Sequence, residues 1–122
     1  MQSQSGTSQV LGVVALLFGS AGAFTIQASY GAIVVARLSV GKYQFQLNTG
    51  VNDNNIAPIV TQFGTSLKMV VTFNPATLAT GISNAANTIE IDFGGSGTTD
   101  PGFGTTINVI FQTCFDVIDN TP

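Results

Sequence analysis

Strict alternation of apolar and polar residues in short segments limits what this chain can fold into. In one such segment Tyr43, Phe45 and Leu47 alternate with Gln44 and Gln46, and later segments repeat the pattern. Successive side chains of a β-strand point to opposite faces, so a period of two places all the apolar residues on one face. The sequence therefore predicts strands that each have one dry face.

Turn-forming residues divide the sequence into short segments of this kind. Gly, Asn, Asp and Pro cluster between the apolar runs, at the spacing expected for a sandwich or barrel. The prediction is an all-β fold: a β-sandwich or jelly-roll-like single domain over residues 10–122, with seven or eight short strands and a polar N-terminal arm over residues 1–9. The expected strands are 10–18, 24–28, 32–38, 43–47, 59–63, 67–73, 88–93 and 106–117.

The connections between these strands carry further expectations. Residues 39–42 form a short connection that contains Gly41, so the strands on either side of it should form a hairpin. Asn74 and Pro75 allow one short helical turn, but an open loop over 74–87 is equally consistent with the sequence. The glycine-rich segment 94–104 is expected to be a flexible loop.

The apolar segment from Val10 to Phe24 has two interpretations. A short apolar core followed by Ala21, Gly22 and Ala23 resembles a secretory signal, but no Lys or Arg precedes it. The segment is also shorter than the roughly 20 residues needed to span a bilayer. A buried strand followed by a small-residue turn is the preferred interpretation, with no membrane partner and with synthesis in a reducing cytosol.

Charged residues make up only 7% of the 122 residues, and the net charge is −3. An ordinary soluble domain has about 25% charged residues. So few cations leave no basic patch for phosphates, which excludes nucleic acid as an expected partner. The polar surface must instead consist of neutral side chains, and Gln44 and Gln46 are candidates for burial against a neighbouring subunit, where a charge would cost far more to desolvate. The composition predicts assembly into an oligomer.

Residues that could carry chemistry are few. Histidine is absent, which removes the commonest general base and metal ligand. Glu90 and Asp92 share one face of a predicted strand and could form a carboxylate pair, although a solvated face is the simpler interpretation. Asp53 lies among asparagines without the rest of a calcium loop, and the glycine-rich segment 94–104 lacks the Lys of a phosphate-binding loop.

Two lysines and one cysteine complete this set. Lys42 and Lys68 could act as amine nucleophiles, but outward charges are expected at both positions. Cys114 is the only cysteine, so no intrachain disulfide can form, and a small buried residue is a more common role than a reactive thiol. We therefore predict no enzyme activity, no cofactor and no metal site.

Three aromatic residues lie near turns rather than in the alternating core pattern. These residues, Tyr30, Phe63 and Phe103, are candidate interface anchors. Together with Gln44 and Gln46 they make up the predicted interaction site. Their partners would be other copies of the chain or a larger assembly.

Residues 30–48, YGAIVVARLSVGKYQFQLN, contain a Val-rich strand that ends in Arg37, a turn with Gly41 and an alternating strand that begins at Tyr43. This block resembles virion proteins of tailed bacteriophages, of the capsid decoration (cement) or fibre type. In that pattern a Val-rich strand ends in Arg and leads through a turn with Gly into Tyr and an alternating strand. The end of the chain, with Phe115, Asp116 and Val117, is similar to the closing strand of those proteins. The residues that carry the first match are Val34, Val35, Arg37, Gly41, Tyr43, Phe45 and Leu47.

The resemblance implies a compact β domain that forms a homotrimer and binds the major capsid protein on the outer surface of the virion. A tail- or head-fibre domain that recognises a host surface is the alternative. An adhesin or pilus-like subunit would require export. The apolar segment 10–18 departs from the more polar first strand of the pattern, which would suit a strand that lies between subunits.

Overall fold

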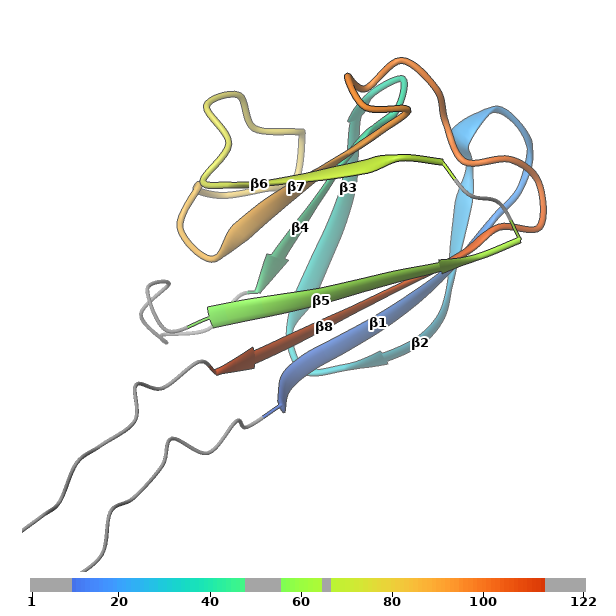
Figure 1. The fold of residues 1–122 in the computed structure, drawn as a ribbon. Coiled ribbons are helices and arrows are strands. Elements are labelled where there is room, and N and C mark those ends of the chain that lie inside the picture. The colour runs from blue at the N-terminus through green and yellow to red at the C-terminus, as the bar shows by residue number, and fades with distance from the viewer. Residues whose placement is uncertain (1–9, 48–55, 65–66, 114–122) are drawn as a thin grey trace, which may run out of the picture.

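The protein forms a sandwich of two four-stranded antiparallel sheets, shown in Figure 1. This computed structural model describes residues 10–47, 56–64 and 67–113. The first sheet has the strand order β2-β1-β8-β5, and the second has the order β3-β4-β7-β6. The strands are β1 (Val10–Phe18), β2 (Phe24–Tyr30), β3 (Ile33–Ser39), β4 (Lys42–Leu47), β5 (Ile56–Phe63), β6 (Met69–Phe73), β7 (Thr88–Phe93) and β8 (Thr106–Thr113). The all-β class and the sandwich are thus confirmed, whereas the 1–9 arm, Asp53, Cys114 and Phe115 to Val117 lie outside the described residues.

The core comes from the two central strands of each sheet. Each of these four strands turns alternate residues inward, as the period-two pattern predicts. Full burial of one such side chain contributes about 1.5–3 kcal/mol, so this cluster is the main stabilising element of the fold. The core residues are Val14, Leu16, Phe18, Tyr43, Phe45, Leu47, Ile89, Ile91, Phe93, Ile107, Val109 and Phe111.

Strand β1 lies in the middle of the first sheet. It pairs with β2 on one side and with β8 on the other, so both of its edges are hydrogen-bonded within the chain. The expectation of a buried strand is confirmed, and the turn after it is the 3-10 turn Ser20–Gly22. From Val13 to Leu17 no edge of β1 is left to pair with another chain, and the suggestion that β1 lies between subunits stays a prediction for its outer face.

Strands β3 and β4 form the expected hairpin. Arg37 pairs with Tyr43, and Ser39 pairs with Lys42 across the turn. Gly41 has a φ of 72°, a conformation that favours glycine. Residues 74–87 follow β6 as an open loop without a helical turn, and no helix in the described ranges is long and apolar enough to cross a membrane.

Candidate functional site

Charge is divided unequally between the two sheets. None of the four strands of the first sheet contains Asp, Glu, Lys or Arg. The charged residues of the described ranges all lie in the second sheet or in the loops at its ends. These residues are Arg37, Lys42, Lys68, Glu90, Asp92 and Asp100.

The outer face of the first sheet consists of three cross-strand rows, which we call the uncharged sheet face. In each row one residue from each of β2, β1, β8 and β5 lies beside its neighbours through the observed strand register. The first row is entirely apolar apart from the hydroxyl of Tyr30. The rows are Tyr30, Val13, Ile110 and Ile59; Ala28, Ala15, Asn108 and Thr61; and Thr25, Leu17, Thr106 and Phe63.

No residue of the uncharged sheet face is buried in the described structure. The residues on the edge strands β2 and β5 are exposed, and those on β1 and β8 are half-buried or exposed. Tyr30 is 64% exposed and Phe63 is 62% exposed, at opposite corners of the face. A soluble monomer rarely leaves a large apolar patch in water, so this face, two thirds of whose residues are apolar, is the candidate interaction site of the described residues.

Phe103 lies near one end of this sheet rather than on the face itself. It is 86% exposed in the loop that leads into β8. That loop meets the end of β5, because a Cβ built on Gly64 would lie 3.1 Å from the carbonyl oxygen of Gly104. The structure therefore brings the loop of Phe103 to the end of the sheet that carries Phe63, and it places Tyr30 away from both.

The outer face of the second sheet is covered over β4 by the chain itself. Gln44 on β4 is 0% exposed. Its Nε2 donates to the carbonyl oxygen of Thr77 at 2.7 Å, and its Oε1 accepts from the backbone N–H of Ala79 at 2.8 Å. The side-chain amide thus donates to and accepts from the backbone of the 74–87 loop, as the backbone of a neighbouring strand would. The prediction that Gln44 faces a neighbouring subunit is wrong, because this loop occupies that position.

Gln46, two residues further along β4, also binds the 74–87 loop. It is 3% exposed, and its Nε2 donates to the hydroxyl of Ser83 at 2.9 Å. Its Oε1 accepts from the backbone N–H of Ser83 at 3.4 Å. The prediction that it packs against another subunit is wrong for the same reason. Neutral amides are used here because they can donate and accept in the same buried place.

The two acidic residues of β7 do not form a solvated face. Asp92 accepts a hydrogen bond from Nζ of Lys42 at 3.0 Å, and Glu90 lies 3.8 Å from the same ammonium. Glu90 also accepts from Nε2 of Gln44 at 2.8 Å, and its side chain is only 12% exposed. Burial raises the pKa of Glu90, and the nearby Asp92 adds to this effect. The expectation of two solvated carboxylates is therefore wrong.

Lys42 is held in its charged form. The hydrogen bond to Asp92 raises its pKa above the ordinary value, so the amine is protonated near neutral pH. A protonated amine is not a nucleophile. The described residues contain no cluster of three or more His, Cys, Asp or Glu side chains that could hold a metal.

A groove of about 440 Å³ lies on the outside of the second sheet, beside the start of the 74–87 loop. Its two charged side chains, Lys42 and Glu90, already face each other at 3.8 Å. No aromatic side chain lines it. The lining residues are Leu38, Ser39, Lys42, Thr72, Pro75, Ala76, Thr77 and Glu90.

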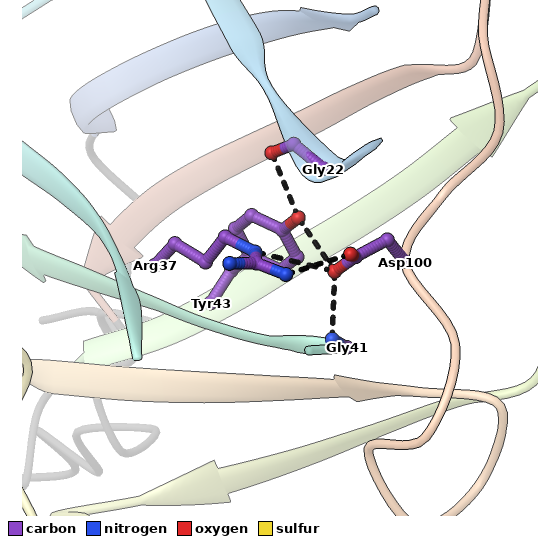
Figure 2. A network of polar contacts seen from close by, with 5 residues as sticks. All are labelled: Gly22, Arg37, Gly41, Tyr43 and Asp100. Carbon is purple, nitrogen blue, oxygen red and sulfur yellow. Dashed lines mark hydrogen bonds and ion pairs between the residues drawn. The ribbon is translucent and has the colours of Figure 1, made fainter. Parts of the chain in front are cut away.

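A polar network at one end of the sandwich is centred on Asp100, as Figure 2 shows. Nη2 of Arg37 donates to Oδ2 of Asp100 at 2.8 Å, and the backbone N–H of Gly41 donates to Oδ1 at 2.7 Å. The hydroxyl of Tyr43 lies 2.9 Å from both Oδ1 of Asp100 and the carbonyl oxygen of Gly22. One proton serves these two acceptors. The network joins the 94–104 loop, the β3–β4 hairpin and the 3-10 turn.

The ionisation of this network follows from its contacts. Burial acts to raise the pKa of Asp100, but the hydrogen bonds from Arg37, Gly41 and Tyr43 outweigh it and hold the pKa below its usual value. Burial raises the pKa of Tyr43, and its bond to Asp100 adds to the effect. Asp100 is therefore an anion and Tyr43 a neutral phenol near neutral pH. Their arrangement holds the 94–104 loop against the β3–β4 hairpin.

Sequence reasoning did not identify Asp100, because its contacts come from residues 57 or more positions away. The one local signal was the step from Asp100 to Pro101 within a glycine-rich loop. The uncharged sheet face was also missed, although the absence of charge from all four of its strands was visible in the sequence.

Comparisons with known protein families, with curated proteins and with solved structures find no match.

Proposed function

We propose that the protein is a non-enzymatic virion structural protein: a capsid decoration (cement) protein that binds the head of a bacteriophage as a homotrimer and stabilises it. The observation that carries this proposal is the uncharged sheet face, an apolar and neutral surface that nothing in the described chain covers. Such a surface favours contact with other protein and offers nothing to an ionic ligand.

The block that resembles phage virion proteins supports the same proposal. Its Arg, Gly and Tyr are the residues that bind Asp100, so the matching positions hold the β3–β4 hairpin against the 94–104 loop. This network joins three segments that are far apart in the sequence, which favours a well-ordered subunit. A rigid subunit loses little conformational entropy when it binds, which suits a protein whose role is to reinforce a shell.

The proposed mechanism is multivalent. Each subunit buries apolar and amide-rich surface outside the contact between copies across the junctions between capsid subunits, and trimerisation lets three modest contacts act together. The major capsid protein is the proposed partner, and the virion surface is the proposed location. The arm over residues 1–9, which lies outside the described residues, is a candidate for an additional contact.

The direct test is to purify virions from the culture that produces the protein, separate their proteins on a gel and image the particles. The proposal expects the chain in many copies per head, at positions on the outer shell. It also expects purified chain to rebind particles from which it has been removed and to raise their thermal stability. A chain found only outside particles, with no affinity for them, would overturn the proposal.

Phe103 favours a second candidate function, a fibre domain that recognises a host surface. An aromatic side chain that is 86% exposed in a loop can stack on a sugar ring, which a decoration protein does not require. This candidate expects the isolated protein to bind host glycans and the Phe103→Ser variant to lose that binding. Equal binding by both proteins, or none by either, argues against it.

A further inference from the structure

The uncharged sheet face differs from the other large surface of the molecule in that no described segment packs on it. Over β4 the outer face of the second sheet is covered by the 74–87 loop, which binds Gln44 and Gln46. Ile59, Phe63 and Tyr30 have no such cover, with exposed fractions of 43%, 62% and 64%. We infer that this face is where one copy of the chain packs against another around the rotation axis of an oligomer. The inference deepens the proposed function, on which it rests for its biological setting.

The distribution of charge favours a second copy over a different partner. Surfaces that meet a different protein commonly use opposite charges to gain specificity. Around a rotation axis, residues near the axis meet their own copies, so any charge placed there would meet a like charge. A face that packs around such an axis therefore avoids charge where it meets its own copies. The four strands of the first sheet contain no Asp, Glu, Lys or Arg.

The polar residues of the face fit the same partner. The middle row contains Asn108 and Thr61, and the third row contains Thr25 and Thr106. Hydroxyl and amide groups both donate and accept, so each can pair with its own copy across an axis. Ala15 and Ala28 are small, which leaves the middle of the face low and lets the backbones of neighbouring copies approach closely.

The size of the face is below that of a standard interface. Along β1, β5 and β8 the three rows span about five residues, so four strands spaced by about 4.8 Å, with about 3.3 Å per residue, present a plan area of about 320 Å². Projecting side chains such as Tyr30 and Phe63 increase the accessible area beyond this value. A standard interface takes about 800 Å² from each partner, so we expect an association that depends on protein concentration.

Two matched threonines test the inference. Thr61 is exposed on the edge strand β5 within the uncharged sheet face, and Thr72 is exposed on the edge strand β6 of the other sheet. Thr61→Lys places a charge on the proposed contact, whereas Thr72→Lys places the same charge beside Glu90. Both positions are exposed, so both variants should fold, and circular dichroism and the unfolding midpoint confirm this before masses are compared.

The masses are measured by sedimentation across a range of protein concentrations. The wild-type chain and Thr72→Lys should form the same oligomer, and Thr61→Lys should need at least about tenfold more protein to associate, a change of about 1.4 kcal/mol. A monomeric wild-type chain, or equal association by both variants, would overturn the inference. The sedimentation measurement uses no virus particles, so it tests this inference separately from the proposed function. An oligomer that does not bind virions would contradict the proposed function but not this inference. A monomer that binds virions would contradict this inference but not the binding to capsids.

Discussion

Asp100 lies 2.8 Å from the guanidinium of Arg37, although 63 residues separate them in the chain. The same carboxylate accepts the backbone N–H of Gly41 and lies within hydrogen-bond distance of the Tyr43 hydroxyl. This carboxylate therefore holds the 94–104 loop, which connects the two sheets, against the β3–β4 hairpin. The stability of this end of the sandwich should depend on its charge.

Replacing Asp100 with Asn should lower the free energy of unfolding by about 1 kcal/mol at neutral pH. Asn keeps an acceptor for Gly41 but loses the ion pair, and Arg37 is 35% exposed, so water screens part of the loss. Because folding lowers the pKa of Asp100, its contribution is present above the unfolded value of 3.8 and is lost as the pH falls through the lower folded value. Urea titrations at neutral and acidic pH should show the two proteins converging in acid. A constant difference would contradict this account.

Replacing Gly22 with Ala should destabilise the protein more than replacing Gly81 with Ala. Both glycines have a positive φ, so both changes introduce backbone strain of about 1 kcal/mol. A Cβ at Gly22 would also lie 2.7 Å from both Oδ2 of Asp100 and the hydroxyl of Tyr43, whereas nothing lies within 4 Å at Gly81. We expect an additional loss of about 1–3 kcal/mol for Gly22→Ala in urea unfolding. Equal losses of unfolding free energy for the two variants would contradict this expectation, because they would show that the side chains of Asp100 and Tyr43 move aside without loss of stability.

Replacing Gln44 with Ala should lower the free energy of unfolding by about 2–4 kcal/mol. The change leaves the carbonyl of Thr77 and the N–H of Ala79 without their buried partner and removes packing beneath the 74–87 loop. Hydrogen exchange at the Ala79 amide should accelerate at the same time. Gln27→Ala is the control, since Gln27 is exposed on β2 and its loss should change stability by less than about 0.5 kcal/mol.

Replacing Glu90 with Gln should leave the protein equally stable or more stable at pH 7. Burial raises the pKa of Glu90 above 4.5, so the folded state holds this proton more tightly and stability falls as the pH rises through the interval above that value. Gln removes the titration and keeps an acceptor for Nε2 of Gln44. Unfolding midpoints at pH 4.5, 6 and 7 should therefore decline less steeply for the variant. A steeper decline would mean that the ion pair with Lys42 dominates.

The core and the strands could be predicted because alternation is a local signal. Tyr43, Phe45 and Leu47 face inward as their spacing indicates, and the hairpin before them forms around Gly41. The same signal failed for Gln44 and Gln46. Alternation shows that the two faces of a strand differ, but it does not show whether the second face meets water or another part of the chain. The choice of glutamine over lysine was the only sign of burial.

The uncharged sheet face could not be assembled from the sequence because it depends on register between distant strands. Ile59 and Tyr30 belong to one row only because β8 lies between β5 and β1. Asp100 was hidden for a similar reason, since its three donors come from the β3–β4 hairpin. Local composition located the glycine-rich loop but not the contact that holds it.

The most direct measurement is side-chain labelling by a photoactivated carbene, applied to the protein at high concentration and again after dilution. If the uncharged sheet face lies between copies, labelling of Ile59 and Phe63 should be low in the concentrated sample and rise on dilution. Val70 and Phe73, exposed on β6 of the other sheet, should be labelled equally in both samples. Equal labelling of Ile59 and Phe63 at both concentrations, or protection confined to Val70 and Phe73, would contradict the account.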